Sequence, residues 1–361
     1  MPPAKPVGTP LKYVVGIDIA KSSFVACLGQ VDGNQQLLFG KETTFENTPS
    51  GFANLLRWVS RQQAATAPLW FVVEATGVYY EELAYFLADQ QQRLSVLLPN
   101  KVKHFARSTE LKSKTDQLDA RLLCRLGLER ALPAWQPPSP ALWRLRALAR
   151  ERQVLTKQGA QLKARVHAYR HSYQPDSRTL ARLAAQQQLV LAQLATLDQD
   201  LTELLAAEPE LARKLAQLTS IPSIGLTTAV IVAAETSGFA LVENERQLAS
   251  YAGLDVVQRQ SGLSAHATRI SKRGNTRLRT ALYLPALSSL RHNPRQIAFY
   301  TRLRTRHPSG KPGVIAVMRK LLVLCYALWK NDRAYDPDYP TAHPVRQEIA
   351  PATEGSRGYT G

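Results

Sequence analysis

The sequence predicts an N-terminal α/β domain followed by a helical region, and three observations lead to this prediction. Over the first 132 residues, short apolar runs that end in turn residues alternate with helical patterns. A Pro-rich joint follows at 133–140, and from Leu142 onward the chain keeps helical periodicity with few helix breakers. We expect an α/β domain, a helical or coiled-coil linker, a mostly helical basic domain and a disordered tail, with the bounds 1–132, 133–217, 218–332 and 333–361.

The α/β domain contains apolar runs typical of β-strands. They lie at Tyr13–Ile19, Ser23–Leu28, Gln36–Phe45, Leu69–Val73 and Leu94–Leu98. The turn residues Asp32, Gly33 and Asn34 separate the second run from the third, and Pro99 stops the last run. Helices are predicted where apolar residues recur at helical spacing. They cover Thr48–Arg61, Tyr79–Gln91 and Thr115–Leu128.

The helical linker contains a heptad-like seam. Between Leu180 and Leu204, apolar residues alternate three and four positions apart, with Gln187 as the one polar interruption. Pro209 ends the pattern. The seam predicts either a coiled coil that serves dimerisation or an ordinary packed helix hairpin within one chain, and the pattern fits both.

Positive charge dominates the chain and is concentrated in two stretches. Lys and Arg total 46 against 28 Asp and Glu, which gives a net charge of +18. Residues 256–330 contain 15 Lys or Arg and no acid, and residues 141–172 contain eight against Glu151 alone. This excess predicts a polyanionic partner and binding that weakens steeply with salt. Nucleic acid fits better than a membrane, because Arg319 and Lys320 interrupt the most apolar late stretch.

The N-terminal segment and the cysteines indicate a reduced cytoplasmic protein, and the positive charge indicates one that handles nucleic acid. The first ten residues, MPPAKPVGTP, lack the apolar segment of a secretory signal. Cys27, Cys124 and Cys325 are too scattered for a disulfide framework or a zinc site.

Carboxylates in the α/β domain indicate a metal site. Asp18 ends the first predicted strand, Glu74 follows a later strand, and Asp116 and Asp119 share one face of a predicted helix. Crowded carboxylates repel one another without a metal, and a pair of Mg²⁺ ions about 3.5–4 Å apart stabilises the attacking and leaving oxygens in phosphoryl transfer. A strand Asp, a later strand Glu and a helical Asp pair are typical of ribonuclease-H-like folds and specifically of RuvC-type nucleases. The neighbourhood of the Asp pair is basic, which suits an approaching phosphate backbone: Lys101, Lys103, Arg107, Lys112, Lys114 and Arg121. Of these, the candidate nucleic-acid contacts are Lys112, Lys114 and Arg121.

Two segments of the basic domain favour contact with a nucleic-acid backbone. The segment Ile221–Gly225 separates two helical patterns, as in a helix-hairpin-helix element. Gly225 would permit the tight turn, and the next helix would offer N–H groups to a phosphate, although a simple turn in the core has the same sequence. The second segment introduces a basic helix, and its candidate phosphate contacts are Lys272, Arg273, Asn275, Arg277 and Arg279.

A serine nucleophile is a further hypothesis for the basic domain. Ser261 and Gly262 follow a strand-like segment at Leu254–Val257, and cationic surroundings help to activate a hydroxyl. Ser264 and Ser271 compete equally on local grounds, and a Ser-Gly pair is also an ordinary turn signal.

Six segments together resemble the insertion-sequence 110 family of DEDD transposases, which also includes the Piv DNA invertase. They read VVGIDIAKSSF, VVEATGVYY, KSKTDQLDARLL, LTSIPSIGLTTA, LASYAGLDVVQRQSG and RISKRGNTRLRTALY. They extend from Tyr13 to Tyr283 and more loosely to Trp329, which is most of the chain. The resemblance implies an N-terminal RuvC-like domain, a helical coiled-coil connection and a C-terminal transposase domain with a nucleophilic serine.

The resemblance also implies site residues, partners and a reaction. The family's metal-binding acids fall on Asp18, Glu74, Asp116 and Asp119, and its serine falls on Ser261. The acids of one protomer would work with the serine of another, in a tetramer of two dimers. A structured non-coding RNA, the bridge RNA, would pair with target and donor DNA and supply sequence specificity. With Mg²⁺ at the acids, the serine would form a 5′-phosphoserine link, and a 3′-OH would reverse it after strand exchange.

Two other functions remain open from the residues. The acids alone also fit a Mg²⁺-dependent junction endonuclease that resembles a Holliday-junction resolvase and uses water as its nucleophile. A non-catalytic DNA- or RNA-binding scaffold would need only the basic surfaces. Ser261→Ala separates the first two, because a resolvase would still nick DNA, and Asp18→Ala would leave every function of a scaffold intact.

Overall fold

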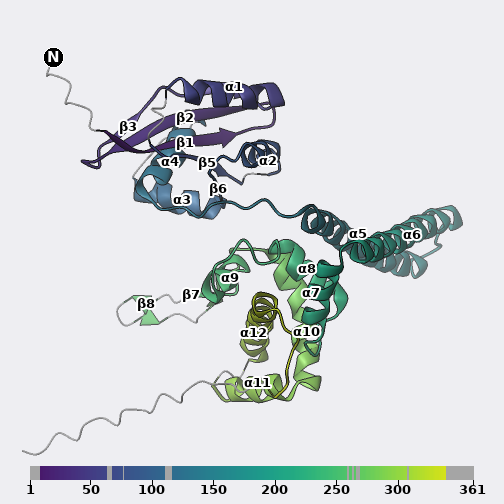
Figure 1. Cartoon of the computed structure of the whole chain (residues 1–361). Coiled ribbons are helices and arrows are strands. Elements are labelled where there is room, and N and C mark those ends of the chain that lie inside the picture. The colour runs from purple at the N-terminus through teal and green to yellow at the C-terminus, as the bar shows by residue number, and fades with distance from the viewer. Residues whose placement is uncertain are drawn as a thin grey trace, which may run out of the picture. The chain divides into compact units, whose positions relative to one another are not determined.

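The computed structural model describes residues 9–62, 67–75, 77–109, 116–257, 260–261, 264–265, 269–306 and 309–338, with the backbone alone for residues 116–118, 257, 260–261, 264–265, 269 and 306. The chain divides into two compact units, Met1–Pro137 and Pro138–Gly361 (Figure 1). In the described ranges, unit 1 combines a mixed sheet with helices and unit 2 is mostly helical. This agrees with the predicted combination of an α/β region and an all-α region.

Unit 1 alternates strands and helices in the order that the apolar runs predict. Its strands are β1 (Pro10–Ile19), β2 (Ser23–Asp32), β3 (Leu37–Phe39), β4 (Thr43–Glu46), β5 (Leu69–Glu74) and β6 (Leu94–Leu97). Its helices are α1 (Pro49–Ser60), α2 (Glu81–Asp89), α3 (Pro99–Ser108) and α4 (Asp116–Glu129).

The strands form one sheet in the order β3-β2-β1-β5-β6, with β4 also paired to β2. The central strand β1 is antiparallel to β2, with Gly16 opposite Cys27, and parallel to β5, with Ile17 opposite Val73. The parallel neighbours β5 and β6 are joined through α2, as a crossover requires. The carboxyl ends of β1 and β5 therefore lie side by side at one edge of the sheet.

Helices cover both faces of this sheet, which is why β1 and β5 are almost continuously apolar. On one face, Val15 and Ile17 of β1 pack with α1 and α2. On the other face, Val14 of β1 and Val72 of β5 pack with α3 and α4. Burial of each such side chain contributes roughly 1.5–3 kcal/mol, so the sheet is a firm frame for the residues at its ends.

Helix α4 lies directly against β1 because glycines stand at the crossing points. A Cβ on Gly16 would lie 2.1 Å from the backbone nitrogen of Cys124, and a Cβ on Gly127 would lie 2.6 Å from Val14 Cγ1. Lys12 Nζ also donates a hydrogen bond to the Gly127 carbonyl oxygen over 2.5 Å. Because these contacts run in opposite directions along the two elements, α4 is antiparallel to β1, and its N-terminus lies toward the carboxyl end of β1.

Unit 1 differs from the sequence-based expectation at two places. The predicted strand Gln36–Phe45 is two strands, β3 and β4, that both pair with β2. Four steps from Phe39 to Thr43 face three steps from Gly29 to Ala26, so one extra residue interrupts the edge strand as a bulge. The sequence pattern does not predict helix α3, because a proline directly after an apolar run indicates the end of a strand. Proline also suits the first turn of a helix, where its missing N–H costs nothing.

Unit 2 begins with two long helices and continues with shorter ones. Its helices are α5 (Pro140–Arg170), α6 (Ser177–Ala207), α7 (Pro209–Thr219), α8 (Leu226–Glu235), α9 (Glu245–Tyr251), α10 (Thr276–His292), α11 (Pro294–Arg306) and α12 (Gly310–Asn331). Its strands are β7 (Val256–Val257), β8 (Gln260–Ser261), β9 (Ser264–Ala265) and β10 (Arg269–Ile270).

Helices α5 and α6 form an antiparallel hairpin (Figure 1). The apolar residues of the heptad-like seam in α6 pack against α5 of the same chain. Val190 and Leu197 of the seam are buried and pack with Leu155 of α5. Gln187, the polar interruption, is partly buried on the same side. Within one chain the seam therefore packs as a helix hairpin, and a role in dimerisation stays a prediction.

The rest of unit 2 packs α7, α8, α10 and α12 around one core, to which the ends of α5 and α6 also contribute. Among the described residues, α12 is the one helix long and apolar enough to cross a membrane. Its apolar residues, such as Val317, Leu321 and Cys325, are fully buried in this core, while Arg319 and Lys320 are exposed. The pattern of α12 is therefore that of a core helix.

The cysteines are core residues. Cys27, Cys124 and Cys325 are all buried with free thiols. Burial raises the pKa of the Cys325 thiol to about 12, so this group stays protonated and unreactive.

Candidate functional site

The candidate acids of unit 1 gather at the carboxyl-terminal edge of the sheet. Asp18 and Glu74 directly follow Ile17 and Val73, which are paired in register between β1 and β5. Successive side chains of a strand point to opposite faces. Ile17 and Val73 belong to the core beneath α1 and α2, so Asp18 and Glu74 stand on the face that α4 covers. Both acids are partly exposed.

The register of α4 on β1 brings the helical acids toward the same edge. A Cβ on Gly16 would lie 2.2 Å from the Ala120 carbonyl oxygen. Asp18 is two residues further along β1, about 6.6 Å, and Asp116 is one turn earlier in α4, about 6 Å. Asp119 directly precedes Ala120. The backbone thus brings Asp18, Glu74 and the start of α4 into one neighbourhood, and the side chain of Asp116 lies outside the described residues.

The chemistry of this edge suits a divalent cation, because Mg²⁺ prefers carboxylate oxygens. Among the side chains that the structure describes, no three carboxylates, histidines or cysteines are close enough to enclose a metal ion. Suitable ligands for a divalent cation therefore converge on one edge of the sheet.

The cations predicted beside these acids have different surroundings. Arg121 is exposed but has internal partners, since its Nη1 lies 3.6 Å from Glu42 Oε1 and its guanidinium lies over the Phe39 ring at 4.9 Å. Lys112 and Lys114 lie outside the described residues. Helix α3, on the same face of the sheet, carries three exposed cations that the sequence also places in the basic neighbourhood of the Asp pair: Lys101, Lys103 and Arg107.

In unit 2, Ser261 belongs to a small β-arm, which is formed by the four short strands β7 to β10 between α9 and α10 (Figure 1). Near its end, β8 pairs with β9, with Ser261 opposite Ser264. Nearer the base, β7 pairs with β10. At the base, the Asn275 N–H donates to the Tyr251 carbonyl oxygen over 2.8 Å. The arm is therefore closed by hydrogen bonds at its base, and the side chains of Ser261 and Ser264 lie outside the described residues.

The third candidate, Ser271, has a structural position. Its Oγ donates to Asp255 Oδ1 over 2.5 Å and accepts from the Arg273 N–H over 3.3 Å. These bonds fix the base of the arm. The structure thus separates Ser271 from Ser261 and Ser264, which sequence reasoning alone did not do.

A buried carboxylate that sequence reasoning missed anchors the arm. Glu235, the last residue of α8, is 3% exposed. Its carboxylate accepts from Arg150 Nε over 2.7 Å, from Arg150 Nη2 over 3.1 Å and from Asn275 Nδ2 over 2.7 Å. Arg277 Nε lies 3.7 Å away, and the Tyr251 hydroxyl donates to the Glu235 carbonyl oxygen over 2.7 Å. Residues of α5 and α10 and the Asn275 cap at the end of the arm therefore meet at this carboxylate, and Tyr251 at the start of the arm binds the backbone of the same residue.

The hydrogen bonds keep this carboxylate ionised. Burial by itself would raise the pKa of Glu235, but the bonds from Arg150 and Asn275 outweigh burial and hold the pKa below its usual range. The sequence carries a weak signal of this role, an acid at the end of the apolar helix Leu226–Glu235.

The candidate phosphate contacts of the basic motif fall into two groups. Asn275 caps α10, and its Oδ1 accepts from the Arg277 N–H over 2.9 Å. Arg277 Nη1 donates to a glutamine of α5 over 2.9 Å, and Arg279 Nη1 donates to a backbone carbonyl at the start of the arm over 2.8 Å. Lys272 and Arg273 are exposed. The first three therefore have scaffolding contacts, and the last two face solvent.

The predicted helix-hairpin-helix turn joins α7 to α8 with different backbone geometry from that expected. The residue with positive φ is Ser223, at 81°, whereas Gly225 has an ordinary extended backbone at φ −83° and ψ 167°. The turn therefore does not need the conformational freedom of Gly225. A Cβ on Gly225 would meet nothing within 4 Å, and no side chain caps α8. The start of α8 is open to an approaching group.

Comparison with known proteins assigns the family. Residues 15–175 match a DEDD family of IS110 elements described as "Transposase", and residues 215–301 match the "Transposase IS116/IS110/IS902 family". The chain is 33% identical over 334 residues to the pilin gene-inverting protein of Moraxella lacunata, which covers 90% of this chain and 98% of the relative. The protein of the same name from Moraxella bovis is 32% identical over 331 residues, with the same coverage. A putative transposase of Sinorhizobium fredii is 28% identical over 266 residues, 61% of this chain and 66% of the relative. The chain therefore belongs to the IS110 family of transposases, enzymes that rearrange DNA.

Proposed function

We propose that the protein cuts and rejoins DNA through a covalent serine–DNA intermediate, with a divalent metal held by the acids of unit 1. One observation carries the proposal: Asp18, Glu74 and the start of α4 converge on one edge of the sheet. The strand order β3-β2-β1-β5-β6, with the first Asp on the central strand, supports a RuvC-like fold for unit 1. The closed arm with Ser261 in β8 supports a nucleophile that is presented away from the helical core.

In this proposal the ligands of Mg²⁺ are Asp18, Glu74, Asp116 and Asp119. When bound there, the metal supplies charge stabilisation for the phosphate and the departing oxygen. The hydroxyl of Ser261 attacks phosphorus, the new Oγ–P bond forms, and the P–O3′ bond breaks. The serine proton is lost to solvent, and the departing 3′ oxygen takes up one proton to become a 3′-OH. Reversal by another 3′-OH after strand exchange rejoins DNA without an external energy source.

The basic surfaces hold backbones and leave sequence recognition to a guide. We assign Lys272, Arg273 and the open start of α8 at Gly225 to phosphate contact. A structured bridge RNA that pairs with donor and target DNA would supply specificity, and the acid-free stretch 256–330 supports such polyanion binding. We further propose that the acids and the serine come from different protomers of a homodimer or homotetramer.

Ser261→Ala tests the proposal against its alternatives. The protein is incubated with Mg²⁺, element DNA and transcript from the element's flanking region, and strand cleavage is read on denaturing gels. We expect Ser261→Ala to abolish cleavage, while Ser264→Ala, the matched change across the same strand pair, retains it. Nicking by Ser261→Ala would favour the water-using junction endonuclease. Unchanged function in Asp18→Ala would favour the non-catalytic scaffold.

A further inference from the structure

The α5–α6 hairpin has an uneven distribution of charge along its length. In the distal part, residues 157–197, there are six Lys or Arg and a single acid, Asp176. In the proximal part of α6 and the residue that follows it, every charged residue is an acid. These acids are Asp198, Asp200, Glu203 and Glu208. A hairpin that needed charge only for solubility would not require this separation.

Two of the four arginines at the base of α5 have acidic partners. Arg150 binds the buried Glu235, and Arg152 Nε donates to Asp198 Oδ1 over 2.8 Å. These arginines act inside the unit, and their charges are neutralised.

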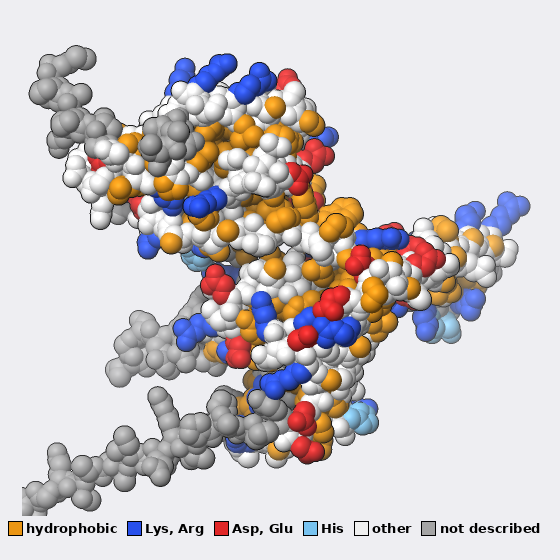
Figure 2. Space-filling model, in the orientation of Figure 1, with side chains coloured by type: hydrophobic (Ala, Val, Ile, Leu, Met, Phe, Trp, Pro, Cys, Tyr) orange, Lys and Arg blue, Asp and Glu red, His pale blue; other side chains and the backbone are white. Residues whose placement is uncertain are grey.

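Cations toward the tip do not have such partners. All six are exposed: Lys157, Lys163, Arg165, Arg170, Arg178 and Arg182. Within this fully described hairpin, the one ion pair among them joins Arg182 to Asp176 at 4.0 Å, and Asp176 also caps α6. Figure 2 shows Lys and Arg gathered at the far end of the hairpin, with His beside them. The tip is therefore an uncompensated basic surface.

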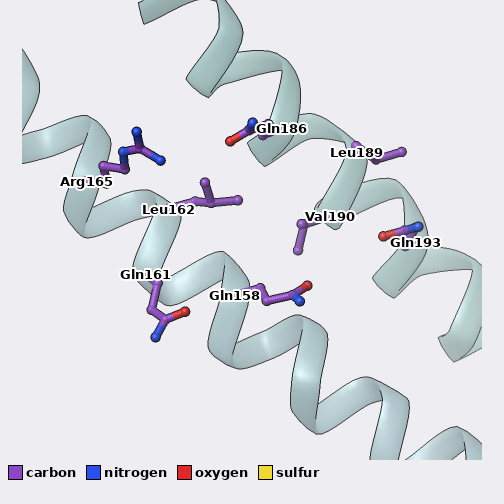
Figure 3. A pocket seen from close by; sticks show the side chains of 8 residues that line it. All are labelled: Gln158, Gln161, Leu162, Arg165, Gln186, Leu189, Val190 and Gln193. Carbon is purple, nitrogen blue, oxygen red and sulfur yellow. The ribbon is translucent and has the colours of Figure 1, made fainter. Parts of the chain in front are cut away.

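Polar groups around the tip suit phosphate oxygens. Tyr173 is 91% exposed at the turn between the helices, and the exposed rings of His167 and His171 lie together with centroids 4.4 Å apart. Toward the base, an open groove between the helices is lined by Arg165 and by glutamines such as Gln158 and Gln186 (Figure 3). Amide, hydroxyl and guanidinium donors are the usual contacts to a nucleic-acid backbone.

We propose that the tip of the α5–α6 hairpin, residues 157–182, binds the phosphate backbone of duplex DNA away from the bonds that are cut. This inference rests on the DNA substrate of the family and not on the serine chemistry. Arg150, which touches the arm's anchor, and Arg170 are twenty residues apart on one helix, or about 30 Å. At about 3.4 Å per base pair, the tip reaches a backbone up to roughly nine base pairs from the level of the anchor. The hairpin thus lengthens the DNA contact without reading sequence.

The salt dependence of binding tests this inference directly. The full-length protein is titrated against linear duplex DNA of arbitrary sequence without metal, so that binding is measured and cleavage is absent. Each phosphate contact contributes about 0.9 to the slope of log K against log salt. Arg165→Gln with Arg170→Gln should therefore lower the slope by about 1.8 and weaken binding at low salt about tenfold or more. Both side chains are exposed, so the melting temperature should not change.

A charge-matched control separates a local contact from a change in net charge. Arg57 and Arg61 are exposed on and just after α1, which covers the sheet face opposite the candidate acids. Arg57→Gln with Arg61→Gln should leave the slope unchanged. An equal loss of slope in both double variants, or no loss at the tip, would overturn the proposal. A loss confined to an RNA hairpin probe, with duplex DNA unaffected, would also overturn it. Cleavage by Ser261→Ala tests only the proposed serine chemistry and does not affect the conclusion about DNA binding by the hairpin tip.

Discussion

The two units hold their candidate catalytic groups by different physical means. In unit 1, Asp18 and Glu74 follow buried strand residues in fixed register, and α4 is pressed against β1 at Gly16. In unit 2, Ser261 lies on short strands whose base is tied to the buried carboxylate of Glu235. The first arrangement depends on apolar packing, and the second depends on a small set of charged hydrogen bonds.

Each unit is therefore vulnerable to a different kind of substitution. Apolar packing is insensitive to pH and tolerates loss of a partly exposed acid at its edge. A buried ionised carboxylate is stable only with all its partners, because an unpaired charge in the interior is costly. Substitutions at the acids should therefore affect catalysis without affecting the fold, whereas substitutions at the anchor should affect the fold of unit 2 first.

The largest expected effect is on catalysis by Asp18→Asn. It keeps the size of a partly exposed side chain but removes the charge that would bind a divalent metal. Strand cleavage should fall by at least about 10²–10³-fold, in line with the removal of one electrostatic stabiliser from a transition state. The melting temperature should stay close to that of the parent. Asp89→Asn, at an exposed position at the end of α2, should retain full cleavage, and equal rates for the two variants would contradict a metal role for Asp18.

Gly16→Ala tests the packing that positions α4. A new Cβ would lie 2.1 Å from the backbone nitrogen of Cys124, and backbone cannot move aside as a flexible side chain can. We expect a loss of about 3 kcal/mol in the free energy of unfolding, measured by urea titration of the whole chain. Gly33→Ala is the matched control, since its Cβ would meet nothing within 4 Å. If the two substitutions cost the same, the close approach of α4 to β1 is not what holds the acids in place.

Glu235→Ala tests the anchor of unit 2. The change leaves Arg150, Arg277 and Asn275 without their common acceptor. Because the Arg150 side chain is 39% exposed and regains some hydration, we expect a loss of about 2–3 kcal/mol in the free energy of unfolding. Glu151→Ala, at an exposed position on α5, should cost a few tenths of a kcal/mol at most. A stability equal to the parent would show that the arm is held by other contacts.

A smaller effect is the pH dependence of the same anchor. The pKa of Glu235 is lower in the folded protein than in the unfolded chain, so the unfolded state binds more protons as the solution becomes acidic. Its stabilising contribution is fully present above the ordinary glutamate range and is lost as the pH falls through the folded-state pKa. The difference in unfolding free energy between the parent and Glu235→Gln should be constant near neutral pH and shrink in acid. A difference that grows in acid would have the wrong sign.

The sequence predicted the elements that depend on local pattern. Apolar runs marked β1, β2, β5 and β6, and helical spacing marked α1, α2 and α4 within a few residues. Asp18 and Glu74 were identifiable as candidates because strand ends are local features, and the parallel pairing that joins them follows from the α/β pattern.

Features that depend on distant contacts were not predictable in this way. Glu235 and Arg150 are 85 positions apart, and neither local sequence reveals the other. The inward turn of Arg277 and Arg279 is also a tertiary feature, since a basic helix has the same sequence whether its cations face DNA or the interior. The bulge between β3 and β4 depends on the register with β2.

The most direct measurement concerns the bond that the account places between protein and DNA. One reaction uses a substrate strand labelled at its 3′ end, and the other uses the same strand labelled at its 5′ end. Both reactions are stopped without protease and separated under denaturing conditions. The account predicts that the 3′-labelled fragment migrates with the protein and that peptide mapping finds the nucleotide on Ser261. It also predicts that the 5′-labelled fragment is released free with a 3′-OH. Cleavage that releases both fragments without attached protein, or an adduct at any other residue, would contradict it.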